Sequence, residues 1–279
     1  MRFFMYMMGF IILAFSPALA EELPPDLIER TARKIDRNLI IKPQDLSQRI
    51  EKGEKVMVVD VRTRELFEQA HLPGSLNIPL YFVKTKSFLK GIPLILMDRG
   101  DQYTQLERES KVLKQSGFDV LILYGGFNAW FGQGYPVGGT RAGGEDIHEM
   151  TPQAFFAERN YDHWLVLDLT ESQETVKLIP YAVSVKLSSD SARFNKQIKQ
   201  AEQDNPDCQI VLMIDEDGKN PDRAQSVISQ SRLKNVYYLS TGLAGYKKFL
   251  QKMGGSRNRE GHKPKRITTA AKRGGCGGS

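Results

Sequence analysis

An internal repeat limits the fold of this chain more than any other feature of its sequence. Marker residues of the first half recur in the second half in the same order and at nearly constant offsets. The pairs are Pro43 and Pro152 (offset 109), Asp60 and Asp168 (108), Pro73 and Pro180 (107), Asp98 and Asp215 (117), and Gly126 and Gly242 (116). The step between the third and fourth pairs indicates an insertion in the second copy, roughly at residues 189–206. Self-similarity at this period predicts a duplicated domain of about 100 residues.

Each copy alternates short apolar runs with stretches that favour helix. The apolar runs lie at 56–59, 94–97 and 120–124 in the first copy and at 165–167, 210–214 and 236–239 in the second. They are bounded by turn residues, as buried parallel strands are. Helix-forming stretches lie between the last two runs of each copy, at 106–117 and near 222–231. This alternation predicts an α/β fold with two tandem, doubly wound parallel-sheet domains.

The N-terminus is typical of an exported protein. Arg2 precedes an apolar run from Phe3 to Phe15, and the small-residue pattern Ala18-Leu19-Ala20 follows. These are the parts of a secretory signal peptide, so we expect the mature protein to be periplasmic or secreted. The alternative is an uncleaved membrane anchor, because about 18 mostly apolar residues are just enough to span a bilayer.

Changes in composition give the expected domain boundaries. The segments are a signal peptide at 1–20, an N-terminal helical lead at 21–40, a first domain at 41–137, a linker at 138–148, a second domain at 149–253 and a tail at 254–279. The linker is rich in glycine and should be flexible. The tail is basic, rich in glycine and without periodicity, so we expect it to be disordered.

The charge of the chain is concentrated in that tail. The formal net charge is +6, and residues 257–279 carry seven cations and one anion, so residues 1–256 sum to zero. A nucleic-acid-binding fold usually presents a basic face, and we therefore expect no nucleic-acid partner. The tail is a candidate contact for an anionic membrane surface. Hydrophobic and charged fractions of 41% and 26% are those of a globular protein.

Three stretches of the first copy carry recognisable motifs. They read Asp60-Val61-Arg62-Thr63-Arg64-Glu65-Leu66-Phe67, Ala70-His71-Leu72-Pro73-Gly74-Ser75-Leu76-Asn77-Ile78-Pro79 and Tyr124-Gly125-Gly126-Phe127-Asn128-Ala129-Trp130. Together they resemble the rhodanese family, and the resemblance covers most of residues 41–137. The second copy is a weaker match, since it keeps Asp168 but has Thr170 in place of Arg62. The resemblance implies two rhodanese-like domains in tandem.

The motif residues also have structural interpretations. Asp60 ends a strand, where its carboxylate can accept backbone N–H bonds or pair with Arg62. The Pro-Gly pair fits a turn, and the Gly-Gly pair permits close backbone approach. We expect His71 to be a capping or core-edge residue; a role as acid or base is the alternative. The motif set is Asp60, Arg62, Glu65, His71, Pro73, Gly74, Gly125, Gly126 and Trp130.

In active members of the family the chemistry rests on a cysteine after the central strand. The backbone N–H groups of its loop point inward, lower the thiol pKa and stabilise a thiolate or persulfide. Here the resemblance places Asp98 at the cysteine position of the first copy and Asp215 at that of the second. A carboxylate cannot accept and pass on sulfane sulfur, so we expect no family activity at either loop. The first loop comprises Asp98, Arg99, Gly100, Asp101, Gln102, Tyr103 and Thr104.

Two interpretations of Asp98 stay open. It is either a built-in anion that accepts the loop N–H bonds, with a depressed pKa, or a solvated loop acid. In the second copy, Asp215, Asp217 and Asp222 suggest calcium by composition. However, Gly218 comes too early for an EF-hand loop, and we expect neither a metal nor a cofactor.

The function hypotheses follow from these replacements. The leading one is an exported, non-catalytic binding or scaffolding module with an unidentified protein partner in the cell envelope. An alternative is a sulfurtransferase or redox protein that uses Cys276, which lies among glycines and cations that favour a reactive thiolate. A second alternative is a sensor of small anions or metals. The sequence thus favours a binding protein over an enzyme.

Overall fold

The computed structural model describes residues 23–140, 148–186, 191–205, 208, 210–219, 222, 228, 229, 233 and 235–261. Several expectations fall outside these ranges. They concern the signal peptide, residues 141–147 of the linker, most of the helix near 222–231, and the tail beyond residue 261, which includes Cys276. Within the described ranges, no helix is long and apolar enough to cross a bilayer.

The first domain is built on a five-stranded parallel sheet with the strand order β1-β5-β4-β2-β3. Its strands are β1 (Ile40–Ile41), β2 (Met57–Asp60), β3 (Leu76–Asn77), β4 (Leu94–Met97) and β5 (Val120–Leu123). Its helices are α2 (Pro43–Glu51), α3 (Arg64–Gln69), α4 (Leu80–Val83), η2 (Ser87–Leu89), α5 (Tyr103–Gln115) and α6 (Gly126–Gly132). Every residue of the central strand β4 is buried, as expected for an apolar strand covered on both faces.

The second domain repeats this architecture with the strand order β6-β10-β9-β7-β8. Its strands are β6 (His148–Met150), β7 (Trp164–Asp168), β8 (Val183–Ser184), β9 (Ile210–Ile214) and β10 (Val236–Leu239). The helices described in it are α7 (Pro152–Glu158), α8 (Gln173–Leu178), α9 (Ser191–Asp204) and α11 (Gly242–Gly261). The predicted α/β fold with two parallel sheets is confirmed. The expected insertion contains α9.

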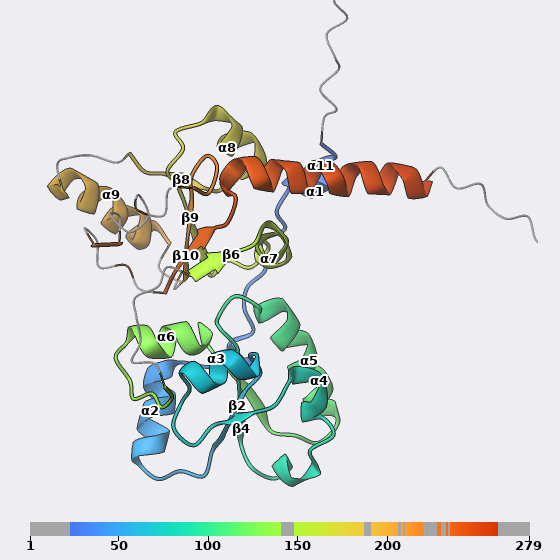
Figure 1. The fold of residues 1–279 in the computed structure, drawn as a ribbon, viewed down its shortest axis with the longest axis vertical. Helices are drawn as coiled ribbons and strands as arrows, with labels where there is room; N and C mark the ends of the chain where they lie inside the picture. Colours follow the sequence, from blue (N-terminus) through green and yellow to red (C-terminus); the bar gives the residue numbers. More distant parts are fainter. Residues whose placement is uncertain are drawn as a thin grey trace, which may run out of the picture.

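The N-terminal lead is not the helical segment that we expected at 21–40. Only α1 (Pro25–Ile28) and the 3-10 turn η1 (Arg37–Leu39) are helical. Between them the backbone of Arg33 pairs with the second domain, donating to Asn160 O (2.6 Å) and accepting from Asp162 N (3.0 Å). This pairing satisfies the backbone groups that a helix would otherwise satisfy. Leu27 of α1 is fully buried, and Figure 1 shows α1 beside α11.

The start of the tail also differs from the expectation. α11 continues to Gly261, so residues 254–261 are helical and not disordered. The helix is already formed and packed through Leu250 and Met253 on the core, and extension of an existing helix is easier than its nucleation. Gly254 lies close to Pro24, where an added Cβ would be 3.4 Å from Pro24 Cδ.

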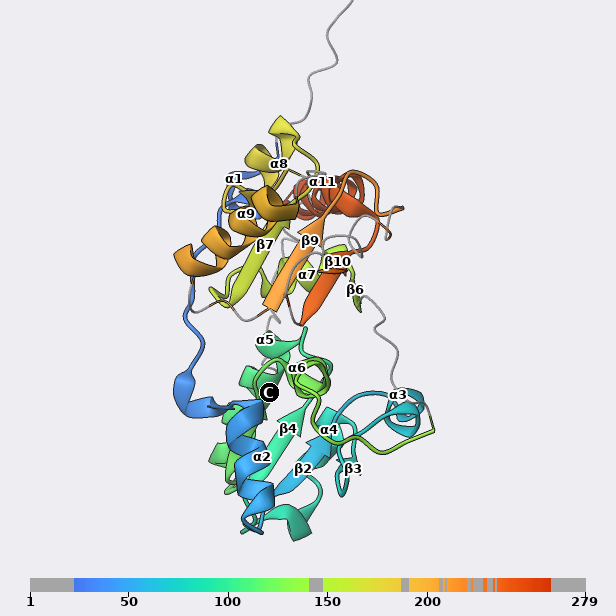
Figure 2. The ribbon, with the colours of Figure 1, turned by 90° about the vertical axis from the view of Figure 1, so that its left-hand side faces the viewer.

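The two domains are stacked, with α6 and α5 of the first below β6, β10 and α7 of the second (Figures 1 and 2). Tyr124 and Gly125, which follow β5, line one cavity together with Leu165 at the start of β7 and Asn235 just before β10. The C-terminal ends of the first sheet therefore face the N-terminal ends of the second. Ligand sites of parallel sheets lie at the C-terminal ends of strands, so the second domain covers that edge of the first.

Candidate functional site

Asp98 follows β4 directly, and its side chain turns into the protein. Its exposed fraction is 4%. Oδ2 accepts a hydrogen bond from Gln102 N (2.9 Å), and the backbone N–H of Gly100 also donates to the carboxyl group. The carboxyl group thus lies where inward-pointing loop amides would hold an anion. This geometry supports the built-in anion and excludes the solvated loop acid.

The ionisation of Asp98 is opposite to the expected one. Burial, and to a lesser extent the neighbouring Asp101, raise its pKa to about 7, against the lowering effect of the hydrogen bonds from Gly100 and Gln102. The expected depression of this pKa is wrong, because it took account of the loop N–H groups but not of the loss of water. Asp98 therefore exchanges its proton near neutral pH.

Two glycines allow this loop to pack against the turn between β5 and α6. A Cβ on Gly126 would lie 2.4 Å from Gly100 N and 2.7 Å from Asp98 O. Gly100 itself has a φ of +119°, and a Cβ there would lie 2.3 Å from Gly125 O. Phe127 N donates to Asp98 O (2.8 Å) across the contact. The Gly-Gly pair of the motif therefore fixes the path of the loop backbone.

Tyr237 of the second domain covers the loop. It comes from β10 and is fully buried. Its hydroxyl accepts a hydrogen bond from Asn128 Nδ2 (2.8 Å) and donates one to Arg99 O (3.1 Å). The Arg99 guanidinium pairs with Asp101 and donates to Glu149 O in β6 (2.9 Å). The loop backbone and one loop side chain are thus held by the second domain.

Glu158, at the end of α7, reaches the other side of the same loop. Its Oε1 accepts a hydrogen bond from Thr104 N (2.9 Å), and Thr104 Oγ1 donates to Ala157 O (3.1 Å). Thr104 lies in the first turn of α5, where unpaired N–H groups and the helix dipole attract an anion. Burial raises the pKa of Glu158 to about 8. The second domain therefore places a carboxyl group on the helix terminus that would attract an anionic substrate.

An aromatic cluster lies beside the loop. His163 is 1% exposed, and its ring is 5.6 Å from that of Tyr103 and 5.7 Å from that of Tyr161, measured between centroids. Burial lowers the pKa of His163 to about 3, so the imidazole is neutral. Neither ring nitrogen has a hydrogen-bond partner in the described structure. Asp98 and His163 both line a space of about 10 Å³, about the size of one water molecule.

The corresponding loop of the second domain is also filled by its own aspartate. Asp215 is 3% exposed; Oδ1 accepts from Gly218 N (2.7 Å), and Oδ2 accepts from the Tyr238 hydroxyl. Asp217 is exposed, and a backbone hydrogen bond from Lys219 lowers its pKa. In the part of the chain that the structure describes, no group of three or more His, Cys, Asp or Glu side chains is placed to hold a metal ion.

The first motif forms a buried ion pair at the C-terminal end of β2. Arg62 Nη2 lies 2.6 Å from Asp60 Oδ2, and Arg62 N donates to Asp60 Oδ1 (3.0 Å). Both interactions that we considered for Asp60 are therefore present. In the second domain Thr170 substitutes for the arginine, and its N and Oγ1 donate to Asp168 Oδ1 (2.8 and 2.6 Å).

The remaining motif residues hold turns and helix ends. His71 Nδ1 is 2.8 Å from Phe67 O, and its backbone exchanges two hydrogen bonds with Gly138 (2.9 and 2.8 Å). Ser75 N donates to Leu72 O (3.1 Å) around Pro73 and Gly74, whose φ is +78°. Exposed Glu65 lies in the first turn of α3, and Trp130 Nε1 donates to Pro136 O (2.9 Å). None of these side chains contacts the Asp98 carboxyl group in the described structure.

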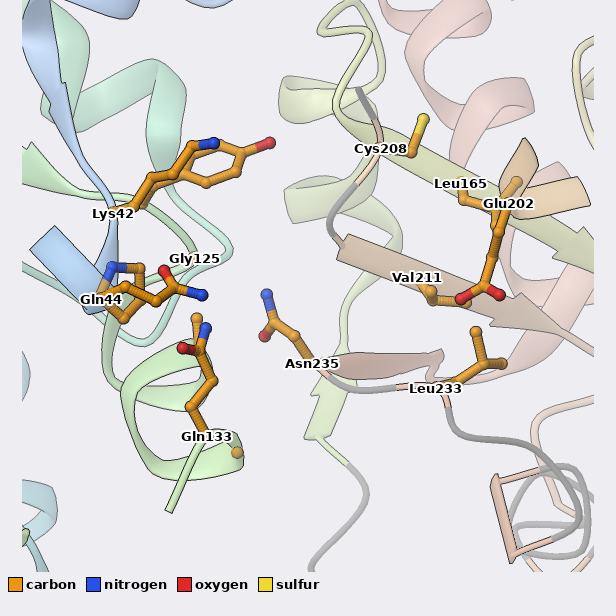
Figure 3. A pocket seen from close by; sticks show the side chains of 14 residues that line it. Lys42, Gln44, Gly125, Gln133, Leu165, Glu202, Cys208, Val211, Leu233 and Asn235 are labelled. Carbon is orange, nitrogen blue, oxygen red and sulfur yellow. The ribbon is translucent and has the colours of Figure 1, made fainter. Parts of the chain in front are cut away.

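The interdomain cavity lined by Tyr124, Gly125, Leu165 and Asn235 has a volume of about 450 Å³. Figure 3 shows Lys42, Gln44 and Gln133 from the first domain opposite Asn235 and Leu233 from the second. Neither amide atom of Asn235 has a hydrogen-bond partner in the described structure. Cys208 also lines this cavity, and its Sγ donates to Asp162 O (3.1 Å).

Sequence reasoning missed Tyr237, Glu158 and His163. All three belong to the second domain, and no local spacing connects them to a loop more than 50 residues away. The sequence signal that could have indicated two of them is that Glu158 and His163 are polar residues shortly before the apolar run that forms β7.

Comparisons with known proteins agree with the motifs. The profile of the family described as the rhodanese-like domain matches residues 42–133. A sulfurtransferase of Allochromatium vinosum is 29% identical over 100 residues, which are 35% of this chain and 92% of that protein. A solved structure from Bacillus halodurans is 31% identical and covers 37% of this chain and 78% of its own, with a TM-score of 0.34. A rhodanese-related protein of Thermoplasma volcanium is 23% identical and covers 36% of this chain and 96% of its own, with a TM-score of 0.32.

The profile match begins at the start of α2 and ends just after α6, so it spans the first sheet except β1. It includes all motif residues and the loop that starts at Asp98. The second sheet repeats the strand order of the first. The chain therefore contains a rhodanese-like domain at residues 42–133, and a second parallel-sheet domain follows it.

Proposed function

We propose that the protein is an exported, non-catalytic binding or scaffolding module of the cell envelope. The observation that carries this proposal is Asp98. It stands where the family resemblance places the reactive cysteine, is 4% exposed, and accepts the N–H bonds of its own loop. The loop is thus already occupied by an anion-forming group, and it contains no sulfur nucleophile.

Two contacts from the second domain support the same proposal. Tyr237 is bound to the loop at Arg99 O, and Glu158 occupies the N-terminus of α5. A thiosulfate ion would have to displace the carboxyl groups of Asp98 and Glu158 from the backbone N–H groups that donate hydrogen bonds to them. Burial of the loop between domains therefore argues for a structural use of the fold, in which the remaining surface binds a partner.

The test is thiosulfate:cyanide sulfurtransferase turnover of the mature protein. We expect no turnover above a buffer control, because neither loop supplies a thiol. Two single variants, Cys208→Ser and Cys276→Ser, and their combination serve as controls. Turnover that persists in the double variant would refute the cysteine argument. Turnover that disappears in Cys276→Ser alone would replace the proposal with a sulfurtransferase that acts through the tail thiol. Sulfurtransferase is also the name of the Allochromatium vinosum relative.

Export and the basic tail belong to this proposal. The N-terminal signal-like segment supports export, and the cations of residues 257–279 would add attraction for an anionic membrane. Mass spectrometry of protein secreted by a bacterial host is the direct test of export. A mature N-terminus at Glu21 is expected, and retention of residues 1–20 would favour the membrane anchor.

A further inference from the structure

One surface of the first domain exposes aromatic side chains that no described part of the chain covers. Tyr81, Phe82 and Phe88 are 58%, 59% and 61% exposed. They come from α4 and from η2, which follows it in the chain; Figure 1 places α4 at the outer edge of the first domain beside α5. The Tyr81 hydroxyl accepts a hydrogen bond from Gln105 of α5 (3.0 Å), while the two phenylalanine rings protrude without polar contacts.

The backbone of this segment holds the rings outward. Val83 and Leu89 are fully buried and anchor the two turns. Successive turn hydrogen bonds join Phe82 N to Pro79 O (2.8 Å), Lys86 N to Val83 O (3.0 Å) and Lys90 N to Ser87 O (3.1 Å). With a rise of roughly 1.5–2 Å per residue in such turns, the three rings are spread over on the order of 10–15 Å. The exposure is therefore a built feature and not that of a frayed loop.

Three lysines flank these rings along the chain, and this segment contains no acidic residue. Lys84, Lys86 and Lys90 are the only charged residues between Ile78 and Met97. No ion pair among the described residues involves any of the three. Lys90 Nζ does lie 5.2 Å from the Phe118 ring centroid. Residues 1–256 have no net charge, so this segment is a local basic area on a neutral body.

We propose that this aromatic–lysine surface, comprising Tyr81, Phe82, Lys84, Lys86, Phe88 and Lys90, docks the first domain onto an anionic phospholipid bilayer. Aromatic rings favour the interfacial region of a bilayer, and lysines beside them attract anionic headgroups. A protein partner fits less well, because lysine is depleted in protein–protein interfaces. The inference is independent of the proposed lack of catalysis, and it differs from tail binding because it places a membrane contact on the folded body.

The test is flotation of the full chain with vesicles of phosphatidylcholine, with and without phosphatidylglycerol. We expect the chain to float with the anionic vesicles only. The double variant Phe82→Ser/Phe88→Ser should bind at least tenfold more weakly. The triple variant Lys84→Gln/Lys86→Gln/Lys90→Gln should lose between tenfold and about 100-fold at low salt, since each lysine near an anionic surface contributes up to roughly fivefold.

Matched controls lie on the second domain. Val176→Ser removes an apolar side chain that is 58% exposed, and Lys196→Gln/Lys199→Gln removes two charges from α9. Both should float as the parent does. The same variants in a chain ending at Gly261 lack five of the seven tail cations and keep all described residues in place.

Fluorescence locates the contact. Trp130 and Trp164 are each 3% exposed, so Phe88→Trp adds the one surface reporter among the described residues. Its emission should shift to the blue on anionic vesicles, whereas that of Val176→Trp should not. Flotation that is equal for the parent and both surface variants would overturn the proposal, as would binding with no shift at residue 88. Absence of any vesicle binding would overturn it as well and would turn attention to a protein partner for this surface.

Discussion

Replacing Asp98 with asparagine keeps the size of the side chain and one carbonyl oxygen but removes the ionisable group. In the folded protein the pKa of Asp98 is about 7, against 3.8 for an unperturbed aspartate. When the pKa of a carboxyl group is higher in the folded than in the unfolded state, the group contributes its full stabilisation at pH values below the unfolded-state pKa. That contribution is lost as the pH rises from about 4 to the folded value. The parent protein should therefore lose stability across this window, and Asp98→Asn should lose less, because only the contribution of buried Glu158, whose pKa is also raised, remains.

The size of the effect follows from the shift. A pKa difference of about 3 units between the folded and unfolded states corresponds to a change of about 4 kcal/mol in unfolding free energy across the whole window. Because Asp98 is buried, solvent screening reduces this change little. The quantity to compare is the change in unfolding free energy between pH 4 and pH 7.5. The asparagine amide has its own hydrogen-bond requirements, which add an offset that does not vary with pH. The change across the window isolates the ionisation.

Urea unfolding followed by tryptophan fluorescence is a suitable assay, because Trp130 and Trp164 report on the first and second domains respectively. The transition seen by each should be fitted separately, since two domains need not unfold together. Asp217→Asn is the control, because that carboxyl group is exposed and its pKa is lowered and not raised. If the curves of Asp98→Asn and the parent run parallel from pH 4 to pH 7.5, the burial argument fails.

Three further substitutions test the contacts around the loop by the same unfolding assay. Glu158→Ala should destabilise the protein by about 1–2 kcal/mol, because Thr104 N loses its capping acceptor, and an unchanged first-domain transition would contradict the contact. Tyr237→Phe removes a hydroxyl that both accepts and donates, with an expected loss of about 1–2 kcal/mol; a neutral effect would show that water replaces it. Gly100→Ala should cost more than about 3 kcal/mol, because its Cβ would meet Gly125 O at 2.3 Å. Gly53→Ala, at φ +70° in open space, should cost only about 1 kcal/mol, and equal losses at the two glycines would refute the close packing.

The central strands could be predicted because their apolar runs are local and continuous. The strand at Leu94–Met97 begins and ends as the run predicted. The edge strands β1, β3 and β8 have two residues each, too few to show a pattern. The duplication could be predicted from marker order alone, without any knowledge of packing.

The environment of the loop could not be predicted in the same way. The position of Asp98 after a strand was readable from the sequence, but its pKa depends on which groups exclude water from it. Those groups include Tyr237 and the aromatic cluster around His163, which reach the loop only through the stacking of domains. The error in the predicted ionisation therefore came from a tertiary contact between segments distant in the chain.

The path of the N-terminal lead has a consequence for the order of folding. Residues 25–33 pack on α11 and beside Tyr161, yet the chain then returns to start the first sheet at Ile40. During synthesis the first domain emerges from the ribosome before either of those contacts exists. Leu27 stays exposed to solvent until α11 has been synthesised. Closure of the lead is therefore a post-translational step, and a nascent chain arrested before residue 242 should leave this segment accessible to protease.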